Sequence, residues 1–466
     1  MRRISFPPLL GRAFVLLGLL AAILSPRPLF GWLNLERARR LEAAGQPAAA
    51  AYAAAAERLP WETGLWERAA LAAAADGDAL TAETYFARAE RQGELTPAGW
   101  LARGDLYAQR GDVASALDAW RQALPSVEAW PRLARAYRQQ GDYPAAIEAW
   151  QAYLALVPAD ATAHYELGLL LCAVRPQEAL PELLLAARLE AEYEPAAQVF
   201  RTALGPLEAD AEPAYWLVVA GRSLLSLGEL DLAQAALERA AILRPDYAEA
   251  WAWWGEARQQ AGLDGAYQIG RALRLDRRSV LVQALAGMYW LRRGEAGRAL
   301  VHYARAAAAE PSNPAWQAAL GEAWEARGDL IRALASYQQA TALAPDDPLY
   351  WRVLAAFCLR NATALETAAL PAVERLLDLA PDDWQTHDLA GQVMTEVGYY
   401  NEAESHLRRA VELAPQQAAP YLHLGMLYLR LGNAPAAQTY LQQAVALDPG
   451  GPSGWRAQRL LEQYFP

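Results

Sequence analysis

Residues 130–158 read WPRLARAYRQQGDYPAAIEAWQAYLALVP, and this stretch decides the fold. Its first half places apolar residues at positions i, i+3, i+4 and i+7, which form one face of a helix. These residues are Trp130, Leu133, Ala134 and Tyr137. Gly141 and Asp142 then predict a turn, because glycine readily takes the left-handed conformation that ends a helix. A second apolar face follows, formed by Ala146, Trp150 and Tyr153. Pro158 ends it, because proline has no N–H to continue the helical hydrogen bonds.

Glycines, alanines and prolines recur along the chain at one shared interval of 34 residues. The glycine pairs are Gly221 and Gly255, Gly287 and Gly321, and Gly391 and Gly425. The alanine pairs are Ala299 and Ala333, and Ala403 and Ala437; the prolines are Pro311 and Pro345, and Pro381, Pro415 and Pro449. Because three residue types keep the same period, the sequence predicts an array of helix–turn–helix units.

This pattern resembles the tetratricopeptide repeat (TPR), whose motif reads W-x2-L-G-x2-Y, then A-x3-F, then P. The opening stretch matches it with Trp130, Leu133, Ala134, Tyr137, Ala146, Trp150 and Pro158. Two further matches are Leu217, Ala220, Gly221, Leu224, Ala233, Leu237 and Pro245, and Tyr421, Leu424, Gly425, Tyr428, Ala437, Leu441 and Pro449. The resemblance implies an all-α fold, a right-handed α-solenoid of about twelve TPR units. The units begin near residues 32, 63, 97, 127, 161, 214, 248, 280, 314, 348, 384 and 418.

The repeat pattern is interrupted in three places. Residues 175–213 are too long for one helix, and within them Glu194 to Leu204 read as an extra helix, either an eroded repeat or a hinge. The unit around residues 262–277 has Gly265 where a small alanine is usual and lacks the closing proline. The unit of residues 348–381 carries about two extra residues after Asn361.

The predicted organisation has five segments, and the last is a capping helix that covers the open end of the array. They are an N-terminal hydrophobic segment (1–31), a first TPR array (32–174), the irregular region (175–213), a second TPR array (214–452) and the capping helix (453–466).

Composition restricts the chemistry. The 466 residues include 42 basic residues, all of them arginine, against 53 acidic ones, for a net charge of −11. Without lysine, Schiff-base and P-loop mechanisms are excluded, and without a basic stripe nucleic-acid binding is disfavoured. Cys172 and Cys358 lie in apolar stretches far apart in the sequence, so we expect two buried free thiols.

The N-terminal residues predict a membrane anchor. Residues 13–24 (AFVLLGLLAAIL) carry no charge, and Arg12 and Arg27 could extend the span to about residues 9–28 by reaching the headgroups. A run this short is also typical of a signal-peptide core, although Pro26 opposes cleavage. We therefore expect a single-pass membrane protein, with export of the bulk of the chain as the favoured orientation. A cleaved signal peptide and a helix outside the membrane stay open as alternatives.

The partner-binding surface is predicted from the TPR resemblance, which implies that the first helix of each unit lines a concave groove. Positions one, five and eight after the leading residue of that helix form a stripe that points away from the core. The predicted groove residues are Arg135, Arg138, Tyr165, Arg222, Glu256, Gln259, Met288, Glu322, Glu325, Arg352, Asp388, Gln392 and Met426. The same stripe includes Leu169, Cys172 and Thr395. Its arginines suit carboxylates, and its Met and Leu residues suit apolar anchors. For any one residue the alternative is an ordinary solvated side chain.

The search for catalytic residues finds no recognised catalytic or metal-binding motif. His387 and His406 fall on facing helices of one repeat, but no Cys or carboxylate stands at ligand spacing, so we expect neither a metal nor a cofactor. We expect a non-catalytic scaffold, tethered to a membrane, that binds a peptide segment or a partner protein in its groove. The alternative is a substrate-recognition or assembly subunit for a separate envelope enzyme, such as a glycosyltransferase or a polymerase.

Overall fold

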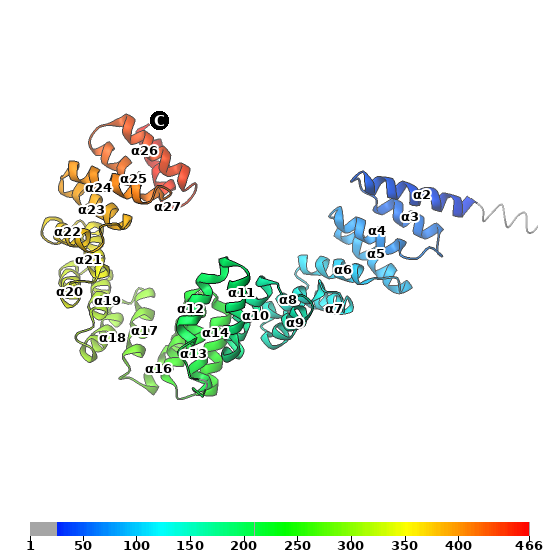
Figure 1. Ribbon diagram of the computed structural model, residues 1–466, viewed down its shortest axis with the longest axis horizontal. Coiled ribbons are helices and arrows are strands. Elements are labelled where there is room, and N and C mark those ends of the chain that lie inside the picture. The colour runs from blue at the N-terminus through cyan, green and yellow to red at the C-terminus, as the bar shows by residue number, and fades with distance from the viewer. Residues whose placement is uncertain (1–25, 209, 466) are drawn as a thin grey trace, which may run out of the picture. The chain divides into compact units, whose positions relative to one another are not determined.

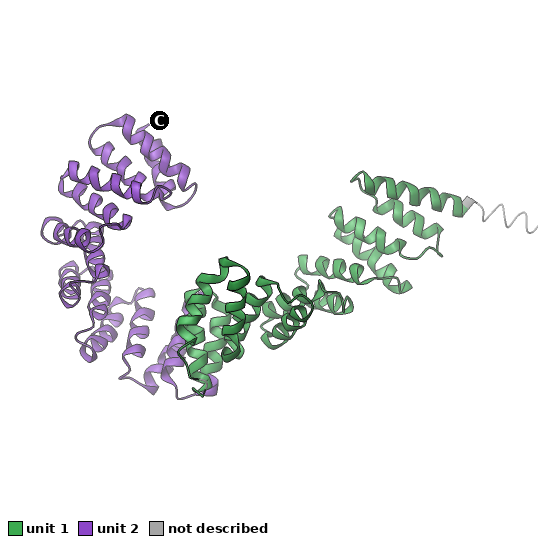
Figure 2. Cartoon of the chain, in the orientation of Figure 1, with its two compact units in different colours: residues 1–240 green, residues 241–466 purple. Residues whose placement is uncertain are grey.

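The computed structural model describes residues 26–208 and 210–465, which form helices and contain no strand (Figure 1). The chain divides into two compact units, Met1–Ala240 and Ala241–Pro466, which are described separately (Figure 2).

The first unit contains helices α2 to α13 and most of α14. Their bounds are α2 (Pro26–Ala43), α3 (Ala49–Arg58), α4 (Leu65–Ala75), α5 (Ala79–Gln92), α6 (Pro97–Gln109), α7 (Val113–Gln122), α8 (Ala129–Gln140), α9 (Tyr143–Leu156), α10 (Ala161–Val174), η1 (Pro176–Glu178), α11 (Ala179–Leu189), η2 (Ala191–Tyr193), α12 (Glu194–Leu204), α13 (Pro213–Ser226) and α14 (Leu230–Leu243).

The second unit contains helices α15 to α27. Their bounds are α15 (Ala248–Gln260), α16 (Ala266–Leu275), α17 (Val280–Arg292), α18 (Ala296–Ala309), α19 (Pro314–Ala326), α20 (Leu330–Leu343), α21 (Pro348–Arg360), η3 (Leu365–Ala369), α22 (Leu370–Leu379), α23 (Trp384–Val397), α24 (Tyr400–Leu413), α25 (Ala418–Arg430), α26 (Ala434–Leu447) and α27 (Pro452–Tyr464).

Successive helices pack as antiparallel hairpins, and a small residue on the first helix of each pair permits the close approach. An added Cβ at Gly287 on α17 would lie 2.4 Å from the ring of Tyr303 on α18. The same relation joins Gly321 to Tyr337 and Gly425 to Leu441, each 16 residues further on. The repeated glycine in the sequence therefore marks the point where a large side chain of the second helix packs against the backbone of the first.

Polar contacts between neighbouring residues fix where the helices begin. Asp142 accepts a hydrogen bond from the N–H of Ala145 and caps α9, directly after Gly141, whose φ is 77°. Asp78, Asp112, Asp329 and Asn433 cap α5, α7, α20 and α26 in the same way. The leading aromatic residue of a first helix often bonds to the proline that ended the previous repeat: Trp351 donates to the carbonyl of Pro345 at 2.9 Å. Where this bond forms, a repeat is tied to its predecessor.

Two of the three interruptions have a packing explanation. Gly265 stands where alanine is usual because its Cα region packs directly on Gly255, and an added Cβ would lie 2.2 Å from the Gly255 carbonyl oxygen. The extra residues after Asn361 form a single π-helical turn, η3, preceded by Ala362 and Ala364 with φ of 48° and 50°. The third interruption contains α12, which occupies Glu194–Leu204, the residues read from the sequence as an extra helix. It packs between α11 and α13.

The C-terminal helix α27 packs on α26 and α25, where Ala457 joins Leu422, Leu441 and Ala444 in a buried cluster. It covers the last hairpin, as expected of a capping helix.

The prediction of single-pass membrane localisation is wrong, because none of the helices described between residues 26 and 465 is long and apolar enough to cross a bilayer. Most of the predicted span, residues 9–25, lies outside the described residues. Its last three residues begin α2, which carries Arg37, Arg39 and Arg40 among its charges and packs against α3.

Candidate functional site

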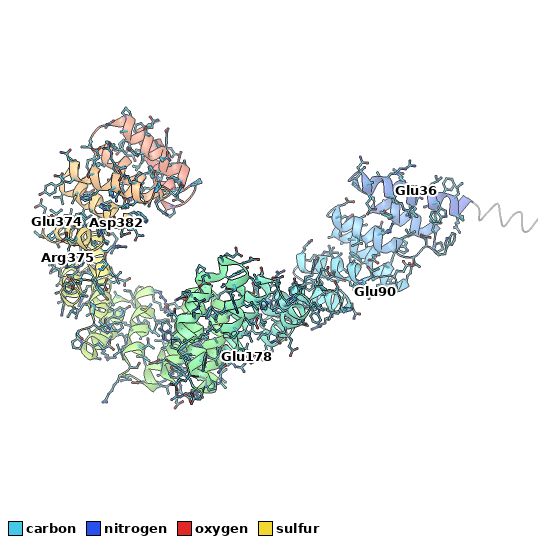
Figure 3. The ribbon with its side chains drawn as sticks, viewed as in Figure 1. Glu36, Glu90, Glu178, Glu374, Arg375 and Asp382 are labelled. Carbon is cyan, nitrogen blue, oxygen red and sulfur yellow. The ribbon has the colours of Figure 1, made fainter. Side chains whose placement is uncertain are left out.

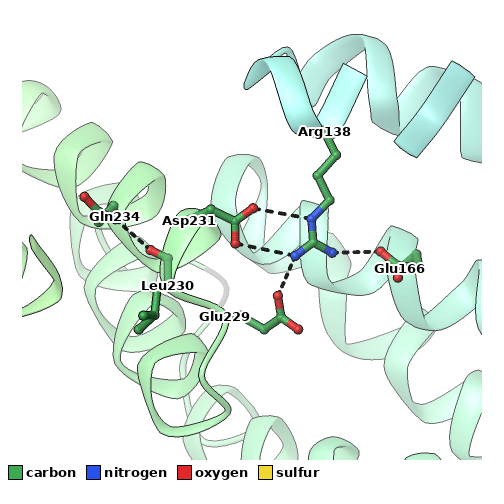
Figure 4. Close-up of polar contacts among 6 residues, drawn as sticks. All are labelled: Arg138, Glu166, Glu229, Leu230, Asp231 and Gln234. Carbon is green, nitrogen blue, oxygen red and sulfur yellow. Dashed lines mark hydrogen bonds and ion pairs between the residues drawn. The ribbon is translucent and has the colours of Figure 1, made fainter. Parts of the chain in front are cut away.

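Arg138, a predicted groove residue, is held by three carboxylates of the chain itself (Figure 4). Its guanidinium lies 2.8 Å from Glu166 on α10, contacts Glu229 in the turn before α14, and lies 3.4 Å from Asp231 on α14. Burial alone favours the neutral form, but the three carboxylates raise the pKa of Arg138 above its usual value. The side chain is 21% exposed and is committed to joining α8, α10 and α14.

The other predicted residues of the first unit lie around this cluster with unequal exposure. Tyr165 on α10 is half-buried and stacks on Tyr193, with 4.6 Å between ring centroids. Arg135 is exposed and lies over the ring of Trp150, and Arg222 is exposed on α13. Leu169 and Cys172 have no exposed surface, and α13 packs against α10, the helix that carries them.

In the second unit, the predicted residues on α15 and α17 are largely internal. Glu256 is 1% exposed and pairs with Arg292 at 2.6 Å. Gln259 donates to the carbonyl of Tyr289 at 3.1 Å. Met288 is half-buried against two core clusters. Glu322, on α19, is exposed.

Four predicted residues lie at or next to one pocket in the second unit, which has a volume of about 410 Å³. The pocket is formed by the first helices α21, α23 and α25 of three consecutive hairpins, together with α24 and the capping helix α27. Its lining residues are Leu359, Arg360, Ala362, Gln392, Thr395, Glu396, Leu407, His423, Met426 and Arg456. Gln392 and Met426 line it directly, whereas Asp388 and Glu325 contact residues that do. This volume is within the range of small-ligand and side-chain pockets.

Ion pairs hold most of the charged groups of the pocket. Arg360 makes two contacts with Glu325, at 3.1 and 3.0 Å. Glu325 also accepts from Asn361, and together these donors lower its pKa although burial opposes the change. On the other side of the pocket, one guanidinium nitrogen of Arg430 donates to both carboxylate oxygens of Glu396, at 3.0 and 3.1 Å. The predicted residue Arg352 lies outside the lining and bonds to Asp383 and Gln385 at the start of α23.

An aspartate orients the pocket histidine. Asp388, 7% exposed, lies 2.7 Å from Nδ1 of His423 and accepts from Gln392 at 2.9 Å. Because a carboxylate only accepts, Nδ1 of His423 carries the proton, and Nε2 is the nitrogen left to interact elsewhere. Nε2 has no hydrogen-bond partner among the described residues. The hydroxyl of Thr395 donates to the carbonyl of Gly391 at 2.7 Å, so it is engaged inside its own helix.

Arg456 and Ala362 were not predicted as site residues. Arg456 on α27 is exposed, lines the pocket, and forms no ion pair with any residue that the structure describes. Ala362 has a positive φ of 48°, a conformation that costs free energy in a residue with a Cβ. Backbone strain of this kind is concentrated at functional sites. Sequence reasoning missed Arg456 because a capping helix was expected only to cover the array.

The first unit holds a second pocket, of about 530 Å³, between α5, α6 and α7. At its centre Arg103 is 8% exposed and pairs with Glu83 at 2.8 Å and with Glu90, labelled in Figure 3, at 2.7 Å. The rings of Trp100 and Tyr107 flank the same guanidinium at 5.5 Å. This arrangement satisfies Arg103 within the chain. The helical spacing of Trp100, Arg103 and Tyr107 was the signal that could have shown it.

The histidines expected on facing helices do meet. His387 and His406 lie with their Nδ1 atoms 3.0 Å apart, and Nε2 of His387 lies 2.8 Å from the carbonyl oxygen of Pro381. Burial, and then the neighbouring His387, lower the pKa of His406. Within the described residues no three His, Cys, Asp or Glu side chains are grouped so as to hold a metal ion. Both cysteines are free and buried, and burial raises the pKa of each thiol, to about 11 for Cys358.

Comparison with known proteins identifies the class. Three family models match the chain in five segments. A TPR-repeat model matches residues 134–173. One tetratricopeptide-repeat model matches residues 67–131 and 218–266, and another matches residues 291–357 and 394–461. The chain belongs to the tetratricopeptide-repeat family. No curated protein matches it.

Several solved structures are similar to this chain at low identity. Yeast Tom70 is 14% identical over 79% of this chain and 88% of its own, with a TM-score of 0.40. Cut9, in its APC/C hetero-tetramer with Hcn1, is 15% identical over 95% of this chain and 96% of its own, with a TM-score of 0.42. YrrB, described as a TPR protein with an unusual peptide-binding site, is 18% identical over 41% of this chain and 97% of its own, with a TM-score of 0.33.

Proposed function

We propose that the chain is a non-catalytic protein-interaction scaffold that binds a segment of a partner protein on the first helices α21, α23 and α25. The pocket beside these helices is the anchor point. The observation that carries the proposal is this pocket, because it combines an apolar lining with polar groups that face the same space. Tetratricopeptide repeats bind protein or peptide partners, and the family membership supports the same reading.

The chemistry of the pocket suits an anchoring side chain. Leu359 and Met426 provide apolar surface on two different helices. Methionine adapts its shape to irregular partners, which favours it on binding surfaces. The polar groups His423 and Gln392 are fixed by Asp388, so little conformational entropy is lost when they contact a ligand.

The same groups do not form a catalytic set. Asp388 and His423 resemble the orienting half of a nucleophilic triad. However, Thr395, which lines the pocket, is only 9% exposed, and its hydroxyl donates to the carbonyl of Gly391. Binding is therefore the role that the geometry supports.

Site-specific photo-crosslinking tests the proposal. A benzoylphenylalanine residue replaces Gln392 in the pocket in one protein, and Gln443, exposed on the second helix α26, in a matched control. Irradiation in cells of the source organism should give one dominant protein adduct from position 392 and none of the same mass from position 443. Identical adducts from both positions, or none from position 392, would reject the pocket as the anchor.

A further inference from the structure

We infer that the pocket recognises an anionic group on the partner, a carboxylate or a phosphate, and that Arg456 of the capping helix is its principal ligand. The inference rests on the proposed function and deepens it. It assigns α27 a second role, because the helix that covers the array also supplies one wall of the binding site.

The pairing of charges around the pocket carries the argument. Arg360 pairs with Glu325, Arg430 pairs with Glu396, and His423 pairs with Asp388. These ion pairs leave Arg456 as the lining cation for which the described residues supply no partner. A guanidinium binds carboxylate and phosphate oxygens in a forked geometry, which makes an anion the matching ligand.

The opposite wall holds a histidine in a fixed orientation. Asp388 holds His423 at Nδ1 and is itself 7% exposed, so the ring is fixed in orientation. The titratable and charged groups that face His423 are Arg360 on α21, Asp388 and Glu396 on α23, and Arg456 on α27.

The apolar lining defines the rest of the ligand. Leu359 and Met426 line the same pocket as Arg456. The preferred ligand therefore carries an apolar side chain next to its anion, such as an acidic or phosphorylated residue beside leucine, or leucine at a chain end. N-acetyl-leucine is the smallest probe with both features, and N-acetyl-leucinamide is its matched neutral control.

The experiment uses the full chain with its methionine methyl groups labelled with carbon-13. The chain has four methionines, and one of them, Met426, lines the pocket, so its methyl resonance reports binding while that of Met288 serves as a remote reference. N-acetyl-leucine, N-acetyl-leucinamide and inorganic phosphate are titrated separately. We expect N-acetyl-leucine or phosphate to shift the Met426 resonance with at least about tenfold higher affinity than the amide, the size of one charge-assisted contact. The tighter of the two anions identifies the source of the group.

Two variants separate the anion site from general effects. Arg456→Gln should abolish the preference for acid over amide. Arg459→Gln, on the same helix and stacked over Trp455, should keep it. Equal affinity for N-acetyl-leucine and its amide in the wild type, or an unchanged preference in Arg456→Gln, would overturn the anion site. If the anion preference is absent but position 392 still crosslinks to a partner, the anion site is rejected and the proposed function is retained. If the anion preference is present but no partner crosslinks, the proposed function is rejected and the anion site is retained.

Discussion

Helix α10 in the first unit and helix α23 in the second carry the same stripe of positions in different surroundings. On α10 the stripe is Tyr165, Leu169 and Cys172; on α23 it is Asp388, Gln392 and Thr395. The leading residue is a histidine in both, and each bonds through Nε2 to the proline carbonyl six residues earlier. The local structure is therefore the same up to the start of the stripe.

What differs is the neighbouring helix. Helix α13 packs against α10, and Leu169 and Cys172 have no exposed surface. On α23 the corresponding Gln392 and Thr395 line the pocket. A motif position therefore fixes the direction of a side chain, whereas the packing of the next repeat decides whether it becomes part of the core or of a pocket wall.

The largest expected effect comes from placing a charge at the equivalent position of each stripe. Leu169→Glu puts a carboxylate where the side chain is 0% exposed, which should destabilise the first unit by about 4 kcal/mol. Gln392→Glu adds a carboxylate beside Asp388 but in an open pocket near Arg456, so we expect a loss within about 1 kcal/mol. Urea unfolding followed by circular dichroism and limited proteolysis measures both. Equal losses would show that the two stripes do not differ in burial.

Removing Arg138 should loosen the packing that buries the stripe on α10. Arg138→Ala leaves Glu166, Glu229 and Asp231 without their shared cation, and we expect a loss of roughly 2 kcal/mol because the guanidinium is mostly buried. Such a loss raises the open population up to about thirtyfold. Iodoacetamide should then label Cys172 faster by a similar factor and leave the rate at Cys358 unchanged.

Arg135→Ala is the control, because Arg135 is exposed and its guanidinium lies over the ring of Trp150. A labelling rate at Cys172 that is the same in Arg138→Ala and in Arg135→Ala would show that the ion pairs do not hold α10 closed.

Local features of the fold were predictable from the sequence, because their causes lie within one repeat. The glycine of each first helix and the large residue 16 positions later belong to one hairpin, and α12 is visible as a segment that breaks the period. Contacts between repeats were not predictable. Arg138 meets carboxylates 91 and 93 residues further on, and Glu256 is buried by an arginine 36 residues away. Periodicity cannot specify such partners.

The candidate site was predictable in part for the same reason. Asp388, Gln392 and Met426 follow from the stripe, because its register is set by the helix itself. Arg456 does not, because it comes from a helix outside the repeats whose docking on α25 and α26 depends on tertiary packing. Ala362 does not either, because two extra residues predict an insertion without specifying the π-turn and the left-handed alanines that absorb it.

A smaller effect tests how the stripe on α23, which lies at the pocket, is held in place. Asp388→Asn keeps one acceptor oxygen but loses the charge that faces His423, which should cost about 1 kcal/mol in stability. The nitrogen-15 shifts of His423 should show loss of the single Nδ1–H tautomer that Asp388 enforces. Asp382→Asn is the control, since Asp382 is 87% exposed and 3.7 Å from Arg409 (Figure 3). An unchanged tautomer in Asp388→Asn would mean that other groups orient the ring.

The smallest effect concerns the residue that faces each leading histidine from the second helix of its repeat. His164 on α10 faces Glu182 at 2.6 Å, whereas His387 on α23 faces His406 at 3.0 Å. Because the pKa of His406 is lowered in the folded state, the unfolded chain binds a proton first as the pH falls below about 6.5. Stability is therefore lost on acidification through that range, at no more than about 1.4 kcal/mol per pH unit, until the folded state also binds the proton.

His406→Glu gives α23 the pairing that α10 already has and removes this contribution. The pKa of His302 is also lowered by burial, but His302 is present in both proteins, so its contribution cancels in the difference between them. Urea midpoints at pH 7.5 and 5.5 should fall more for the wild type than for His406→Glu. If both midpoints fell equally, the histidine pair would not account for any acid sensitivity of the second unit, and the two helices would differ only in what covers their stripes.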